Sequence, residues 1–305
     1  GRQLSDQVLR SVSVYSFSSG SAEQLMMVGY SKFITCDLND DGCSELMVIL
    51  PGESETGTGS AVLYRMQDGN IERSVEVNVS EDATHIRRIT VGRLLGGTPA
   101  VFVASAVNNS AIVTDVFAWR NDRFSNISYS RESDTSVQTL RNYYVYAEDI
   151  DGDGVMELPS LITMKRVFPE QEGKQKFLIR WFAMDLEGRE MDKFFTFHNY
   201  LGGWYMQLAS SWAPRVSVEQ EGGKYTFYVW DEDYRQALDV FSIYALTGGS
   251  REEDATVDGR FAFYRAEGVV YAAKLEANAA EFGIPENQLI NNFHLIQQDW
   301  KTGET

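Results

Sequence analysis

Short apolar runs alternate with polar turns along most of the chain. Three units of this kind follow one another, near residues 30–85, 86–140 and 141–200. Each has a strand-like run, a gap and a second strand that ends in a polar turn. The second strands are residues 62–66, 116–119 and 177–184, and the turn dipeptides after them are Asp68-Gly69, Asn121-Asp122 and Glu187-Gly188. Such dipeptides between apolar runs predict β-hairpins. A repeat of about 50 residues, each a small meander, is typical of propeller blades or a similar β array.

Beyond about residue 200 this repeat stops and a simpler alternation of polar and apolar residues begins. Strands are predicted over residues 215–219, 224–230, 238–246, 260–265 and 269–274, with hairpin turns at Gly222-Gly223 and Glu267-Gly268. Pro285 opens a predicted helix. Its apolar stripe is Leu289, Ile290, Phe293, Ile296 and Trp300. We therefore predict a mainly β protein, with β-propeller-like repeats over residues 1–204. A small α+β domain follows over residues 205–305, with an antiparallel sheet and a C-terminal helix.

The charge balance excludes some classes of partner. The chain has 305 residues, with 44 acidic against 27 basic side chains and a net charge of −17. A groove for nucleic acid or a basic membrane-binding patch is not expected on such a chain. No run of 18 apolar residues is present, so we expect no transmembrane segment. The N-terminal sequence GRQLSDQVLR shows no signal peptide, and we expect a processed chain whose lipid anchor, if it has one, lies outside it.

Two segments share the pattern D-x-[DN]-x-D-G-x-x-E-L, at residues 37–46 and 149–158. We name them the first acidic loop (residues 37–45) and the second acidic loop (residues 149–157). A middle copy, the middle loop (residues 92–100), lies halfway between them. It keeps the glycine of the turn but has lost the acidic side chains. In it Gly92, Leu94, Gly96 and Ala100 stand where the first loop has Asp37, Asn39, Asp41 and Glu45.

The acidic loops carry oxygen atoms at alternate positions, which suits Ca²⁺, a hard ion that binds six to eight oxygens. Positions 1, 3, 5 and 9 offer side chains and position 7 a backbone carbonyl. The predicted ligands are Asp37, Asn39, Asp41, the Cys43 carbonyl and Glu45 in the first loop, and Asp149, Asp151, Asp153, the Val155 carbonyl and Glu157 in the second. An EF-hand needs a glutamate at position 12, where these loops have Val48 and Ser160. It also needs a pair of helices, whereas residues 145–147 before the second loop and 158–164 after it are predicted as strands. The alternative is a solvated acidic turn without an ion.

These repeated strand–loop–strand units resemble the FG-GAP/VCBS-type repeats of β-propellers, including those of integrin α-chains and of many secreted or surface-anchored bacterial proteins. The resemblance implies that each intact loop joins two strands of one blade and binds one structural Ca²⁺, up to two in all, with none in the middle loop. It also implies a secreted or cell-surface location, for example that of a bacterial lipoprotein. Propellers close with four to eight blades, and three units are clear here. A closed, an incomplete and an open array therefore all remain possible.

The rest of the sequence offers little catalytic chemistry. His85, His198 and His294 are solitary, and no nucleophile elbow, zinc motif or P-loop is present. Cys36 and Cys43 bracket the first acidic loop, and both a disulfide and two reduced thiols are open. The sequence favours a non-enzymatic extracytoplasmic scaffold for adhesion or binding, with a protein or carbohydrate ligand. The alternative is a hydrolase or lyase acting on polysaccharide, with the β repeats as its platform.

Overall fold

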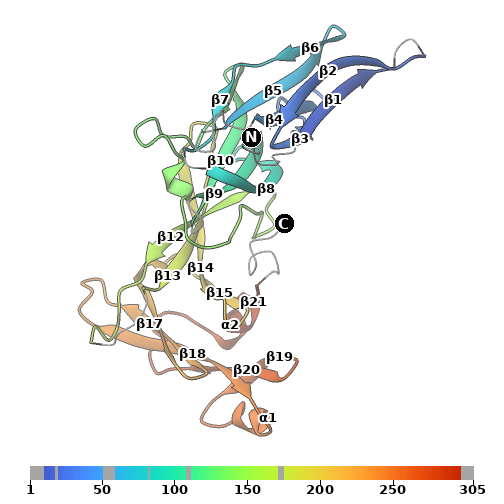
Figure 1. The fold of residues 1–305 in the computed structure, drawn as a ribbon. Helices are drawn as coiled ribbons and strands as arrows, with labels where there is room; N and C mark the ends of the chain where they lie inside the picture. Colours follow the sequence, from blue (N-terminus) through green and yellow to red (C-terminus); the bar gives the residue numbers. More distant parts are fainter. Residues whose placement is uncertain are drawn as a thin grey trace, which may run out of the picture. The chain divides into compact units, whose positions relative to one another are not determined.

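The computed structural model describes residues 10–17, 20–50, 59–81, 83–107, 111–170 and 175–296 (Figure 1). The protein is mainly β, as predicted: the described residues form strands β1–β21, two short α-helices and two 3₁₀ helices. The strands make several separate sheets, and none closes on itself within the described part of the chain. Among the same residues, no helix is long and apolar enough to cross a membrane.

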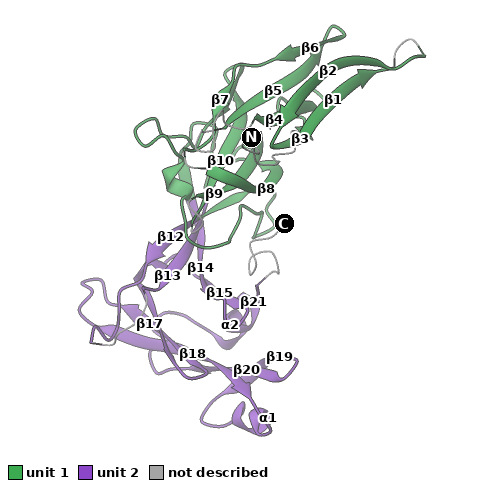
Figure 2. Ribbon diagram, in the orientation of Figure 1, with its two compact units in different colours: residues 1–159, 183–191, 302–305 green, residues 160–182, 192–301 purple. Residues whose placement is uncertain are grey.

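The chain forms two compact units (Figure 2). Unit 1 contains residues 1–159, 183–191 and 302–305, and unit 2 contains residues 160–182 and 192–301. The domain boundary predicted between residues 204 and 205 lies inside strand β15 (Trp204–Leu208), in unit 2, and stays a prediction.

Unit 1 begins with an antiparallel hairpin and continues with two antiparallel meanders. The hairpin is β1 (Arg10–Ser16) and β2 (Glu23–Tyr30). The first meander has β3 (Lys32–Cys36), β4 (Glu45–Leu50), β5 (Ser60–Gln67) and β6 (Asn70–Arg73) in chain order, with β7 (Val77–Asn78) also paired to β5. The second has β8 (Ala83–Arg93), β9 (Pro99–Val107), β10 (Ala111–Arg120) and β11 (Arg123–Asn126), and a 3₁₀ helix at Val137–Thr139 follows.

The predicted turn dipeptides close these meanders. Asp68 and Gly69 have φ of 50° and 80° and join β5 to β6, while Asn121 and Asp122 have φ of 47° and 59° and join β10 to β11. Two successive positive φ values mark a type I′ turn, whose twist matches that of the strands it connects. The second strands predicted for the first two sequence repeats (residues 62–66 and 116–119) lie within β5 and β10, so the positions of both hairpins were predicted correctly.

The core of unit 1 lies where apolar residues of the two meanders pack together. Met47, Ile49 and Leu63 of the first meander share one cluster with Val101 and Phe117 of the second. The apolar residues Leu46, Val48, Val62 and Tyr64 form a separate cluster, and the β1–β2 hairpin packs against it.

Unit 2 contains most of one five-stranded sheet and all of another. The first has the order β12 (Glu157–Thr163), β13 (Phe177–Met184), β14 (Glu190–Asn199), β15 and β21 (Phe293–Leu295). The second, which follows a 3₁₀ helix at Ala213–Arg215, has the order β16 (Val216–Glu221), β17 (Lys224–Trp230), β18 (Ala237–Thr247), β20 (Val269–Leu275) and β19 (Phe261–Ala266). This second sheet confirms the five strands predicted from the alternation and their antiparallel pairing.

Two predicted elements differ from the structure. The helix α2 (Glu286–Asn292) begins after Pro285 as predicted but ends at Asn292, because the chain becomes extended at Phe293 and pairs with β15 as β21. Asparagine is a poor helix former, and the free edge of β15 offers backbone hydrogen bonds. Phe293 and Ile296 are therefore buried without extending the helical stripe, and Trp300 lies outside the described residues. A second helix, α1 (Arg251–Asp254), has a single turn.

The other difference precedes the second acidic loop. Residues 145–147 were predicted as a strand, yet the structure has only one bridge there, between Glu148 and Glu157. Val145 and Tyr146 are nonetheless fully buried. The apolar pattern therefore reports burial of an extended segment rather than membership of a sheet.

Candidate metal sites

The first acidic loop connects β3 to β4 and gathers three carboxylates. Oxygen atoms of Asp37, Asp41 and Glu45 lie within 4.8 Å of one another. Gly42 has φ of 86° and Asp40 has φ of 56°, values that bend the chain sharply and that glycine and aspartate tolerate best. The loop thus brings positions 1, 5 and 9 of the motif to one point.

Backbone N–H groups of the loop bind these carboxylates. The N–H of Leu38 donates to Oε2 of Glu45 (2.8 Å), that of Gly42 to Oδ2 of Asp37 (2.8 Å), and that of Cys43 to Oδ1 of Asp41 (2.7 Å). The bond from Cys43 is the main reason why the pKa of Asp41 lies below its usual value, whereas burial raises the pKa of Glu45. The turn is therefore held by its own hydrogen bonds, and the carboxylates keep further lone pairs for a cation.

The second acidic loop repeats this arrangement. The N–H of Ile150 donates to Oε2 of Glu157 (3.1 Å), that of Gly154 to Oδ2 of Asp149 (3.0 Å), and that of Val155 to Oδ1 of Asp153 (2.9 Å). These bonds join the same motif positions as in the first loop. Here the clustered oxygens, again within 4.8 Å, belong to Asp149, Asp151 and Asp153, while Glu157, at the same motif position as Glu45, is fully buried.

The donor sets fit a single hard cation. Oxygens bound to one Ca²⁺ lie at 2.3–2.6 Å from it, so two of them are separated by about 5 Å at most, and both clusters meet that limit. In addition, Oδ1 of Asp149 is buried without a hydrogen-bond partner. A buried carboxylate oxygen without a partner is costly, and a cation would satisfy it.

The other predicted ligands lie in the same loops. Asn39 is bonded to Asp41 through both side-chain atoms, since its Nδ2 donates to Oδ2 (2.8 Å) and its Oδ1 accepts from the backbone N–H (3.0 Å). The carbonyls of Cys43 and Val155 stay predicted ligands. Cys36 and Cys43 are both free thiols, and burial, with the nearby charges of Glu45 and Asp37, raises the pKa of Cys36 to about 12. The disulfide alternative is therefore not realised in this structure.

The strands that flank the middle loop pair in a different register from those that flank the acidic loops, which the match of motif positions did not predict. In both acidic loops the residue just before position 1 faces position 9: Cys36 pairs with Glu45, and Glu148 bridges Glu157. In the middle copy Gly92 itself pairs with Ala100. The strands therefore extend further and leave a hairpin of residues 94–98, which the N–H of Leu94 closes by donating to the carbonyl of Thr98 (2.8 Å).

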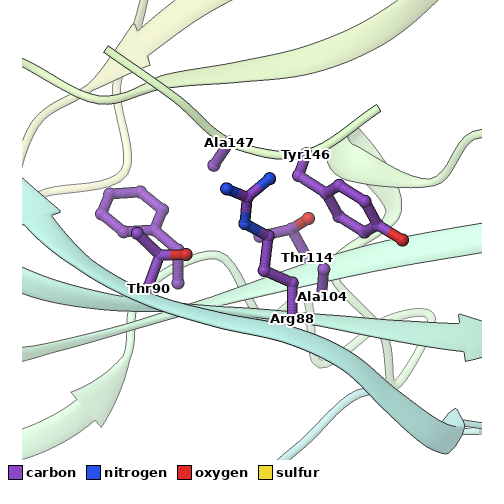
Figure 3. Close-up of a pocket in the computed structure, with 7 residues that line it drawn as sticks. Arg88, Thr90, Ala104, Thr114, Tyr146 and Ala147 are labelled. Atoms are coloured by element: carbon purple, nitrogen blue, oxygen red, sulfur yellow. The ribbon is translucent and has the colours of Figure 1, made fainter. Parts of the chain in front are cut away.

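A narrow pocket lies in unit 1 (Figure 3). Arg88 and Tyr146 both line it, with the guanidinium carbon of Arg88 over the Tyr146 ring, 5.4 Å from the ring centroid. The other lining residues are Thr90, Phe102, Ala104, Thr114 and Ala147. The pocket is too narrow to admit a water molecule, so it offers no space for a substrate in this conformation.

The sequence did not predict the burial of two polar side chains, those of Asp115 and His198. Asp115 lies in the middle of the apolar strand β10 and is fully buried. The one sign of this in the sequence is that an acidic residue interrupts an apolar run. His198 is also buried, and its Nε2 lies 3.0 Å from Oγ1 of Thr196. Nothing in its sequence neighbourhood distinguishes it from the other two histidines.

Comparisons with known proteins add little. No protein-family model matches the chain, and no curated protein matches it. Among solved structures, it is similar to a proposed 6-phosphogluconolactonase from Bacteroides fragilis NCTC 9343, at 10% identity and a TM-score of 0.30, covering 89% of this chain and 95% of that one. A second proposed 6-phosphogluconolactonase, from Bacteroides uniformis ATCC 8492, has 11% identity and a TM-score of 0.27, covering 92% and 90%. Similarity at this level supports no conclusion about fold or activity.

Proposed function

We propose that the protein is a non-enzymatic, extracytoplasmic β-repeat scaffold whose two acidic loops each bind one structural Ca²⁺. The observation that carries the proposal is the equivalence of the two loops. Three backbone-to-carboxylate hydrogen bonds join the same motif positions in both, and each loop gathers three acidic oxygens within 4.8 Å. In the second loop, Oδ1 of Asp149 is in addition buried without a hydrogen-bond partner, and a bound cation would satisfy it.

The bound ion would be held by the ligands predicted for each loop. Ca²⁺ supplies the positive charge that lets clustered carboxylates lie close together without mutual repulsion. The chain's own groups do the rest: the backbone N–H groups orient the carboxylates, and the glycines of the turn keep the oxygens on one side. The role proposed for the ion is to fix the connection between two strands, not to take part in a reaction.

The strand order of unit 1 supports the proposal of a propeller-like, FG-GAP/VCBS-type arrangement. The first acidic loop joins the first two strands of a four-stranded antiparallel meander, β3 to β6, and a second such meander, β8 to β11, follows directly. Consecutive four-stranded meanders are the building blocks of propellers. The proposed array is open or incomplete and not closed.

The proposed location rests on calcium supply and charge. Loops built from a few carboxylates bind Ca²⁺ at the weak end of the range, and such sites stay filled outside the cell rather than in the cytosol. The net charge of −17 also suits a soluble surface protein. We extend the proposal to a cell-surface binding or adhesion role, as in a bacterial lipoprotein, with a protein or carbohydrate ligand.

Calcium is expected to raise the thermal stability of the chelator-treated protein. An ion at a hundred times its dissociation constant adds about 2.7 kcal/mol for each filled site, or roughly 5 °C in midpoint for a chain of this size. Asp41→Ala and Asp153→Ala, each of which removes an oxygen of one cluster, should each reduce the calcium-dependent rise by about half. Thermal unfolding followed by circular dichroism over a calcium titration measures this.

The matched control is Glu132→Ala, which removes an exposed acidic side chain of unit 1 outside both loops. Its calcium-dependent rise should equal that of the wild type. If the wild type shows no rise in calcium, the loops are only hydrogen-bonded turns, and the structural-calcium proposal and the extracytoplasmic location fall together.

A further inference from the structure

The two acidic loops both contact the dipeptide Gly92-Arg93, at the end of β8. On one side, the guanidinium of Arg93 lies 3.3 Å from both carboxylate oxygens of Asp40 in the first acidic loop. On the other side, the carbonyl of Arg93 accepts a hydrogen bond from the N–H of Met156 in the second acidic loop (2.9 Å). One short segment of the middle loop therefore touches a residue of each acidic loop.

Gly92 packs directly on Met156. A Cβ atom at position 92 would lie 2.1 Å from Cγ and 2.7 Å from Sδ of Met156, much closer than two atoms can approach. The side chain of Met156 therefore occupies the space that any larger residue at position 92 would need. Position 92 is where the motif carries its first aspartate, so this packing also explains why the middle loop cannot keep that carboxylate.

Arg93 is held from within its own loop as well. Its Nη1 also donates to the carbonyl of Gly97, at the tip of the hairpin. The side chain is about half exposed, as is that of Asp40. An ion pair with this exposure is weak, so its effect on the affinity of a neighbouring site is limited to a few-fold.

We propose that the middle loop couples the two ion sites, with Arg93 as the connecting residue, so that calcium bound in one acidic loop increases the affinity of the other. The inference rests on the proposed calcium binding and adds its regulation. The middle loop, which has lost its own ligands, would then act as the link between the two loops that keep theirs.

The sign of the coupling follows from ordering. An ion in the first acidic loop orders the turn that carries Asp40. Through the ion pair it also orders Arg93, whose carbonyl accepts the hydrogen bond from Met156. The second ion then meets a loop that is already ordered and pays less conformational entropy. Direct repulsion between the two ions acts in the opposite direction, but salt screens it over about 10 Å. We expect positive coupling of about three- to fivefold, the size of an exposed pair with one hydrogen bond.

Calorimetric titration with Ca²⁺ alone tests this. The wild type gives two stepwise association constants, while Asp41→Ala and Asp153→Ala each leave one intact loop with one association constant. The product of the two wild-type association constants should exceed the product of the two single-loop association constants by about three- to fivefold. In the Arg93→Met background, which keeps the apolar stem but removes the guanidinium, the ratio should fall close to one.

Arg73→Gln is the matched control, because Arg73 forms a similarly exposed ion pair with Glu76, away from both loops. It should leave the coupling unchanged. Gly92→Ala, which forces Met156 to move, should weaken only the second acidic loop, and Met156→Ala in the same chain should restore it. If calcium binds but the wild-type ratio is one, or if Arg93→Met keeps the wild-type ratio, the coupling is wrong and the calcium proposal stands. If calcium does not bind to either loop, both are wrong.

Discussion

Replacing Asp115 with alanine is expected to lower the free energy of unfolding by about 3–5 kcal/mol. The carboxylate is fully buried and accepts four hydrogen bonds. These come from the backbone N–H (2.9 Å) and hydroxyl (2.7 Å) of Ser80, Nδ2 of Asn126 (2.9 Å) and the hydroxyl of Ser136 (2.6 Å). Truncation removes the acceptor of both Ser80 donors, whereas Asn126 keeps the carbonyl of Asn78 (3.0 Å) and Ser136 keeps Oγ of Ser128 (2.8 Å) as partners. Each buried donor left without an acceptor costs about 1–3 kcal/mol before the structure relaxes.

The network also connects distant parts of unit 1. Ser80 and Ser136 lie outside the meander strands, and the N–H of Ser136 donates to the hydroxyl of Ser80 (2.9 Å). Asp115 therefore attaches two connecting segments to strand β10. Its loss should allow both segments to open before the sheets unfold, which amide hydrogen exchange would detect as faster exchange near these serines.

Urea denaturation of Asp115→Ala, Asp115→Asn and Glu81→Ala gives the comparison. Asparagine keeps one acceptor and should cost less than alanine, while Glu81 is exposed and its substitution should change stability by less than about 0.5 kcal/mol. A loss below about 1 kcal/mol for Asp115→Ala would mean that water replaces the carboxylate, and that the network does not hold the segments.

Local patterns predicted the parts of this fold that depend on neighbouring residues. The dipeptides Asp68-Gly69 and Asn121-Asp122 determine their turns through positive φ alone, so both hairpins could be located without knowledge of the rest. The strands of the second sheet of unit 2 were predicted for the same reason, since alternation records which face is buried. The acidic loops share this property, because their hydrogen bonds join residues two to seven positions apart.

The features that sequence reasoning missed depend on distant partners. Helix α2 ends early because β15 receives the next residues as a strand, and the intervening 85 or so residues give no local sign of this pairing. The middle loop has no room for an aspartate at position 92 because Met156, 64 positions later in the chain, packs against Gly92. Asp115 is acceptable in an apolar strand only because Ser80 and Ser136 reach it from 35 and 21 positions away.

The pH dependence of stability should depend strongly on His198. Its ring is buried in unit 2 and contacts two tyrosine rings, that of Tyr205, stacked with a centroid distance of 5.0 Å, and that of Tyr200, tilted at 5.6 Å. The indole N–H of Trp181 donates to Oγ1 of Thr196 (2.9 Å), and Nε2 of His198 is hydrogen-bonded to the same hydroxyl at 3.0 Å. A neutral imidazole suits this arrangement, and burial lowers the pKa of His198 from 6.5 to about 3.

His198 makes the folded protein less stable in acid. Between pH 6.5 and about 3, the unfolded chain takes up a proton at His198 and the folded protein does not. Acid therefore favours unfolding, and the contribution of His198 is fully present above pH 6.5 and falls by about 1.4 kcal/mol for each pH unit below it. Between about pH 7 and pH 4.5 the loss amounts to roughly 2.7 kcal/mol.

His198→Phe keeps the aromatic packing but cannot take up a proton, so its stability should fall less steeply with acid than that of the wild type. The acidic side chains titrate in both proteins and cancel when the two curves are subtracted. Urea denaturation at about pH 7, 5.5 and 4.5 should therefore give a difference that changes by roughly 2.7 kcal/mol, whatever the cost of the substitution at neutral pH. His85→Gln, at an exposed histidine, should give a curve parallel to that of the wild type. Parallel curves for His198→Phe as well would mean that the folded protein protonates His198 as readily as the unfolded chain does, and that the ring is not sealed from water.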